Sequence, residues 1–126
     1  MKFFLYNFIL ILLLPLIISR LIIRSLKDKD YVKNISNRFG IYEIETESNP
    51  VWFHAVSLGE VISSETLIKK ILNDNKVVLS VSTPTGYRQA KKIFRNSLQI
   101  VYAPWDIYFF VNNFLKKFNP KALIIF

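Results

Sequence analysis

The sequence predicts an α/β protein whose parallel sheet lies behind an N-terminal membrane helix. Three observations support this fold class. The first two dozen residues are almost continuously apolar, and from Val51 onward short apolar runs alternate with amphipathic helical patterns. Turn residues separate each run from the helix that follows it. Strands that alternate with helices form parallel sheets, because each helix carries the chain back to the starting edge.

The length, composition and net charge of the chain narrow the kinds of partner and chemistry that it can have. The chain has 126 residues, 52% of them hydrophobic, and a formal net charge of +8. That length suffices for one small domain with a core, and the charge predicts an anionic partner such as a membrane surface, a phosphorylated substrate or nucleic acid. The chain has no cysteine and one histidine. A disulfide scaffold, thiol chemistry and a metal centre are therefore not expected.

Residues 1–25 are predicted to form a membrane anchor helix. The apolar run from Phe3 to Ser19, extended to Ile23, nearly reaches the roughly 20 residues that cross a bilayer. A cleaved signal peptide is the alternative, but the segment offers no small-residue cleavage site. More basic residues follow the run than precede it, which predicts that the rest of the chain faces the cytoplasm. An orientation partly in the membrane interface stays open.

Residues 26–50 are predicted to form a polar bridge. The mixed-charge run 27–30 is typical of a solvated face, and residues 31–40 suit a short amphipathic helix that ends at Gly40. Residues 51–126 then suit a partial Rossmann-like domain. Its strands are expected at 51–56, 77–81, 99–102 and 122–126. Helices are expected at about 60–72, 84–94 and in the segment that ends near Phe118, with Thr83 as an N-cap.

Three turns follow the first three strands, and right-handed crossovers would bring them to one edge of the sheet. Helix N-termini at that edge favour anionic groups such as phosphate. The polar or glycine positions in these turns are Ser57, Gly59, Glu60, Thr83, Thr85, Gly86 and Asp106. Arg88 begins a basic run on the second helix, which is either a phosphate-facing stripe or a solvated face. A dinucleotide-binding dehydrogenase is disfavoured, because no G-x-G-x-x-G occurs. Nucleic-acid binding is disfavoured because no recognised motif accompanies the charge.

Glu60 has two interpretations. The spacing Ser57-x-x-Glu60 fits a capping box, in which the carboxylate only accepts a backbone hydrogen bond. The same carboxylate, above the carboxyl end of a strand, could instead take a proton from an incoming hydroxyl. His54 lies inside the strand, and we expect it to be structural and hydrogen-bonded rather than catalytic.

Four short motifs resemble those of one enzyme family. They are His-Ala-Val-Ser-Leu-Gly-Glu at 54–60, Ser-Thr-Pro-Thr-Gly at 82–86, Pro-x-Asp at 104–106 and Arg-x-Gly at 38–40. Together they resemble the N-terminal part of the transferases of 3-deoxy-D-manno-octulosonic acid (Kdo). The resemblance implies a GT-B glycosyltransferase with two Rossmann-like domains, of which the N-terminal one takes the acceptor. It also implies that Glu60 is the general base and that the other turn residues and Arg88 contact the acceptor.

The implied reaction is transfer of Kdo from the donor CMP-Kdo to the lipid A precursor, without a metal or other cofactor. The donor-binding domain is missing from residues 1–126, so we expect a truncated half that is inactive alone. It would work with a C-terminal half on another chain or in a longer product. The expected location is the cytoplasmic face of the inner membrane, beside its anionic leaflet. The alternative is a non-catalytic, membrane-anchored remnant that binds an anionic lipid or phosphate.

Overall fold

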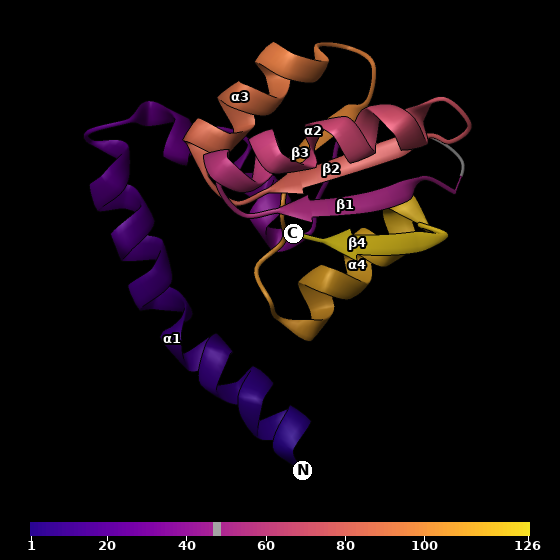
Figure 1. Ribbon diagram of the computed structural model, residues 1–126. Coiled ribbons are helices and arrows are strands. Elements are labelled where there is room, and N and C mark those ends of the chain that lie inside the picture. Colours follow the sequence, from indigo (N-terminus) through magenta and orange to yellow (C-terminus); the bar gives the residue numbers. More distant parts are fainter. Residues whose placement is uncertain (47–48) are drawn as a thin grey trace.

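The computed structural model of the protein describes residues 1–46 and 49–126 (Figure 1). Glu47 and Ser48, which fall within the predicted bridge, lie outside the described residues. The helices are α1 (Lys2–Ser25), α2 (Leu58–Leu72), α3 (Pro84–Phe94) and α4 (Tyr108–Phe118), with 3-10 helices η1 (Lys29–Tyr31) and η2 (Ile35–Phe39). The strands are β1 (Val51–Ala55), β2 (Val77–Val81), β3 (Gln99–Tyr102) and β4 (Ala122–Ile125).

The four strands form one parallel sheet in the order β3-β2-β1-β4. The predicted fold class is therefore confirmed. Because β2 lies on one side of β1 and β4 on the other, the chain reverses its direction of travel across the sheet at β1. In open α/β sheets, ligands bind at the carboxyl ends of the strands beside such a switch point.

Helices cover both faces of the sheet (Figure 1). Phe53 and Ala55 of β1 are fully buried in the cluster that contains residues of α2 and α3, whereas Trp52 lies in the opposite cluster with Phe114 of α4. This alternation follows from the two-residue period of a strand. All five residues of β2 are buried, as expected for an interior strand covered on both faces.

The bridge differs from the single amphipathic helix that the sequence predicts. Two 3-10 helices take its place, because Asn34 adopts a left-handed conformation at φ 52° and separates them. The predicted end at Gly40 is confirmed, with φ at 73°. A Cβ atom at Gly40 would lie 2.3 Å from the carbonyl oxygen of Phe110, so both its conformation and its neighbour require glycine.

The mixed-charge run of the bridge binds α3. Arg88 forms ion pairs with Asp28 at 3.0 Å and with Asp30 at 2.5 Å. The guanidinium of Arg88, followed by the backbone N–H of Asp30, lowers the pKa of Asp28. These side chains are a third to a half exposed, so the pairs hold the bridge in position more than they stabilise the fold.

Candidate functional site

The first turn joins β1 to α2 and sets the position of Glu60. Ser57 is the N-cap of α2, but its side chain makes no capping hydrogen bond. Instead, Oε2 of Glu60 accepts a hydrogen bond from the backbone N–H of Val56 at 2.5 Å. The expected capping box is thus replaced by a single hydrogen bond, in which the carboxylate reaches one residue further back than the N-cap residue, its usual partner. Glu60 is half-buried at the carboxyl end of β1, and Gly59 is exposed with no atom near its Cβ position.

The second turn joins β2 to α3 and contacts the first. Thr83 is the N-cap, as predicted, and its Oγ1 accepts from the backbone N–H of Gly86 at 3.1 Å. A Cβ atom at Gly86 would lie 3.3 Å from the carbonyl carbon of Ser57, so the two turns are in van der Waals contact. The hydroxyl of Thr85 lies on the exposed side, 3.3 Å from that of Thr83.

The third turn, after β3, presents Asp106 to a different neighbour. The carboxylate of Asp106 is exposed, and its Oδ2 accepts from the hydroxyl of Tyr6 in α1 at 2.5 Å. Arg88 points toward the bridge, where it binds Asp28 and Asp30. The structure therefore brings the first two turns together, while Asp106 contacts the N-terminal helix and Arg88 contacts the bridge.

A hydrogen-bonded chain of side chains crosses from β1 to β2. The buried hydroxyl of Ser80 lies 2.8 Å from Nε1 of Trp52 and 2.8 Å from Nδ1 of His54. The indole can only donate, so Ser80 accepts from Trp52 and its own hydrogen is free to bind Nδ1 of His54. Burial lowers the pKa of His54, whereas the charge of Glu60 raises it to a smaller extent. The prediction that His54 is hydrogen-bonded is confirmed.

His54 and Asp106 line the same cavity on the α4 side of the sheet. This cavity of about 350 Å³ lies between β1, β4 and the third turn, and its other walls are mostly apolar. The arrangement places an imidazole and a carboxylate around one cavity, at a sheet edge that also carries Glu60.

Comparison with known proteins agrees with these motifs. The family model described as 3-Deoxy-D-manno-octulosonic-acid transferase (kdotransferase) matches residues 33–126. The chain belongs to the Kdo transferase family. A 3-deoxy-D-manno-octulosonic acid transferase of Haemophilus influenzae is 29% identical over 97% of this chain and 30% of its own length. No solved structure matches the chain.

Other relatives match over smaller shares of their length. A probable mitochondrial 3-deoxy-D-manno-octulosonic acid transferase of Arabidopsis thaliana is 29% identical over 88% of the chain and 26% of its own length. A bifunctional glycosyltransferase/methyltransferase of Fusobacterium nucleatum is 34% identical over 60% of the chain and 12% of its own length. The chain thus spans less than a third of each of these relatives.

Within this Kdo transferase domain, Arg38 is the residue whose importance sequence reasoning underestimated. It is 6% exposed, its Nη2 donates to the carbonyl of Ser82 at 2.8 Å, and its guanidinium lies 4.5 Å from the ring centre of Tyr102. Its own carbonyl accepts from the backbone N–H of Trp105 at 2.8 Å. Arg38 therefore connects the second and third turns. The Arg-x-Gly motif was the signal that could have identified it.

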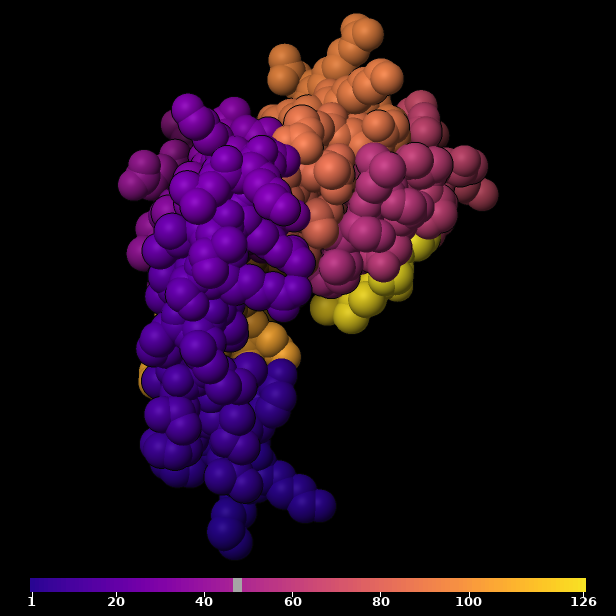
Figure 2. Space-filling view, turned by 90° about the vertical axis from the view of Figure 1, so that its left-hand side faces the viewer, coloured from indigo at the N-terminus to yellow at the C-terminus, as the bar shows by residue number. Residues whose placement is uncertain are grey.

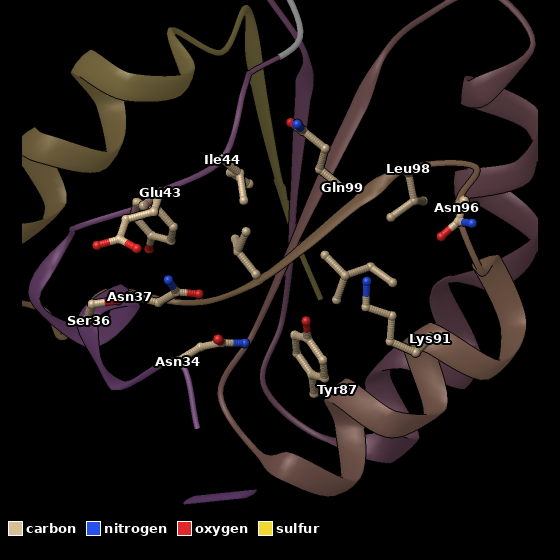
Figure 3. Close-up of a pocket in the computed structure, with 13 residues that line it drawn as sticks. Asn34, Ser36, Asn37, Glu43, Ile44, Tyr87, Lys91, Asn96, Leu98 and Gln99 are labelled. Atoms are coloured by element: carbon tan, nitrogen blue, oxygen red, sulfur yellow. The ribbon is translucent and has the colours of Figure 1, made fainter. Parts of the chain in front are cut away.

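Burial removes water from the guanidinium of Arg38 and so lowers its pKa, because the charged form is less well solvated. A larger cavity, about 470 Å³, lies elsewhere, at the outer edge of β3 (Figure 3). Lys91 and Tyr87 of α3 approach it from one side and Asn34 and Asn37 of the bridge from the other (Figure 3). None of the predicted site residues lines it. Within the described part of the chain, no cluster of side chains suits a metal ion.

Proposed function

We propose that this chain supplies the acceptor side of an enzyme that transfers Kdo from CMP-Kdo to the lipid A precursor, in lipopolysaccharide synthesis. The observation that carries the proposal is the position of Glu60, in a chain of the Kdo transferase family. Its carboxylate lies at the carboxyl end of β1, beside the switch point and within reach of solvent. That is where an acceptor hydroxyl could approach a base.

In the proposed reaction, Glu60 takes the proton from an acceptor hydroxyl as that oxygen attacks the anomeric carbon of Kdo. The bond from this carbon to the phosphate oxygen of CMP breaks, and CMP leaves with the electron pair. The hydrogen bond from Val56 would hold the carboxylate in place during this transfer. Ser57, Gly59, Thr83, Thr85 and Gly86 would border the acceptor on the two turns that touch.

The donor site is proposed to come from residues outside 1–126, because the chain covers 30% of the Haemophilus relative. Neither a metal nor a further cofactor enters the proposed step. The proposed location is the cytoplasmic face of the inner membrane. The single long apolar helix within the described residues and the basic residues after it support this location.

A second candidate function is a non-catalytic, membrane-anchored domain that binds an anionic lipid or phosphate. One observation favours it. Arg20 and Arg24 of α1 and Arg38 of the bridge line one cavity of about 200 Å³ beside the second and third turns. Three cations around one cavity suit a phosphate group.

The two functions are separated by a transfer assay with labelled CMP-Kdo, the lipid A precursor, and this chain combined with the remaining domain of a relative. Glu60→Gln keeps an oxygen that can accept from Val56, so folding should persist while transfer falls by at least about 100-fold. Glu65→Gln is the matched control, since Glu65 lies on the same helix and pairs with Lys69. Unchanged transfer in Glu60→Gln removes Glu60 from the mechanism. Precursor binding without transfer in every combination favours the second function.

A further inference from the structure

The N-terminal helix contacts the α/β domain near both of its ends. Near the start of α1, Tyr6 donates to Asp106 at 2.5 Å, and Asn7 Oδ1 accepts from the backbone N–H of Tyr108 at 2.7 Å. The rings of Phe3 and Tyr108 lie edge to face with their centres 5.7 Å apart. Near its other end, Leu21 is buried and lines a cavity together with Arg38 and Trp105. Figure 2 shows α1 extending along and beyond one side of the domain.

These contacts are incompatible with a helix that spans the bilayer. At 1.5 Å per residue, Tyr6 lies about 28 Å along the axis of α1 from Ser25, nearly the roughly 30 Å thickness of the hydrocarbon core. In a spanning orientation, Tyr6 and Asn7 would therefore reach the far side of the bilayer. Asp106 and the start of α4 would have to follow them, and placing a carboxylate at that depth is costly.

The two faces of α1 differ in what covers them. Half-buried or buried positions recur at 7, 10, 14, 17 and 21, which is the helical period, and this face is turned toward the domain. The exposed surface of α1 carries a stripe without charge, whose first two residues also border the start of α4. We call it the outer stripe, and it consists of Phe4 (76% exposed), Phe8 (55%), Leu12 (68%), Leu16 (66%) and Ile23 (64%).

Cationic and aromatic groups flank the outer stripe. Arg20 and Arg24 lie on one flank of α1 and line the cavity they share with Arg38. Phe109 of α4, 66% exposed, joins the start of α1 around an apolar cleft of about 240 Å³. An apolar stripe beside arginines is complementary to a bilayer that contains anionic lipids.

From these observations we infer that α1 lies in the plane of the membrane surface, clamped to the domain, with its outer stripe in the acyl region of an anionic bilayer. The proposed occupant of this surface is the bilayer itself. The inference rests on the proposed membrane association and is independent of Kdo transfer. A helix that is apolar on both faces needs two apolar neighbours, and here the domain is one and the lipid the other.

Because the chain has no cysteine of its own, a thiol-reactive dye attaches only to the cysteine that is introduced. Leu12→Cys and Leu14→Cys are matched variants two residues apart, the first on the outer stripe and the second on the half-buried face. Each full-length variant carries a polarity-sensitive dye and is placed in vesicles of phosphatidylcholine and phosphatidylglycerol with nitroxide-labelled acyl chains. We expect strong quenching at Leu12→Cys and weak quenching at Leu14→Cys, with Phe4→Cys and Ile23→Cys as deep as Leu12→Cys.

A spanning helix gives the opposite pattern. Residues 12 and 14 would both lie near the bilayer centre and be quenched alike, and Phe4→Cys and Ile23→Cys would be shallower. Either result overturns the inference. A second measurement does not depend on a dye at Leu14. In vesicles, a short bismaleimide should cross-link Phe3→Cys to Tyr108→Cys but not to Lys70→Cys on α2, and failure of the first cross-link also overturns the inference. Neither measurement uses Kdo transfer, so the proposed reaction is tested separately.

Discussion

Gly40 offers the sharpest test of how the bridge is attached to the domain. Substitution by alanine forces a side chain into a left-handed conformation at φ 73°, which costs about 1 to 2 kcal/mol. The new Cβ would also lie 2.3 Å from the carbonyl oxygen of Phe110 and 3.0 Å from the Cβ of Asn113. Relieving such overlap by shifting neighbours costs roughly 1 to 3 kcal/mol. We therefore expect Gly40→Ala to lower the free energy of unfolding by about 2 to 4 kcal/mol, after a small gain from the stiffer unfolded chain.

Gly59→Ala is the matched control within the same chain. A Cβ atom at Gly59 meets no atom within 4 Å, and Gly59 lies inside α2. Alanine there should leave stability unchanged or raise it by up to about 1 kcal/mol, because alanine favours the helix. The assay is urea denaturation of both full-length variants in the same detergent, followed by the fluorescence of Trp52 and Trp105. A loss below about 1 kcal/mol in Gly40→Ala, or an equal loss in both variants, refutes the reasoning.

Three further predictions follow from the buried polar groups and the site. Burial lowers the pKa of His54, so the unfolded chain binds the proton of this histidine more readily than the folded chain does. The free energy of unfolding should therefore fall as the pH drops through about 6.5. His54→Gln should remove this pH dependence, which denaturation curves at pH 5 and 7.5 would measure. Ser80→Ala leaves the indole N–H of Trp52 without its acceptor and should lower the free energy of unfolding by about 1 to 3 kcal/mol. His54 loses the same partner, so the ¹⁵N NMR shifts of this single histidine should show a mixture of tautomers. Arg38→Ala should cost about 2 to 3 kcal/mol in the same unfolding assay, and Arg38→Lys should recover only part of it, because a lysine cannot lie flat on Tyr102.

The sheet could be predicted from sequence because its signals are local. The bounds of β2, α3 and β3 agree with the expected ranges, since each element begins or ends at a turn residue or cap such as Thr83. The first strand ends one residue early, at Ala55, because Val56 is already part of the turn and is 41% exposed. Periodicity and turn chemistry are enough where neighbouring residues decide the structure.

The bridge and the surroundings of the site could not be predicted in the same way. The pairing of Arg88 with Asp30 and Asp28 joins residues 58 and 60 positions apart, which no local pattern reports. The Arg-x-Gly motif includes Arg38, but the tertiary contacts that bury it between two turns leave no local signal. The roles of Glu60 and of the turn residues in catalysis and acceptor binding remain predictions.

The contact between Tyr6 and Asp106 has a consequence for the order of events during synthesis. The two residues are 100 positions apart, so at about 5 to 20 residues per second the ribosome needs roughly 5 to 20 s to make the second after the first. For part of that interval, α1 has already left the ribosome but its partner on the domain does not yet exist. The nascent helix can cover its apolar surface only with lipid or a targeting factor, so delivery to the membrane precedes closure of the domain against it.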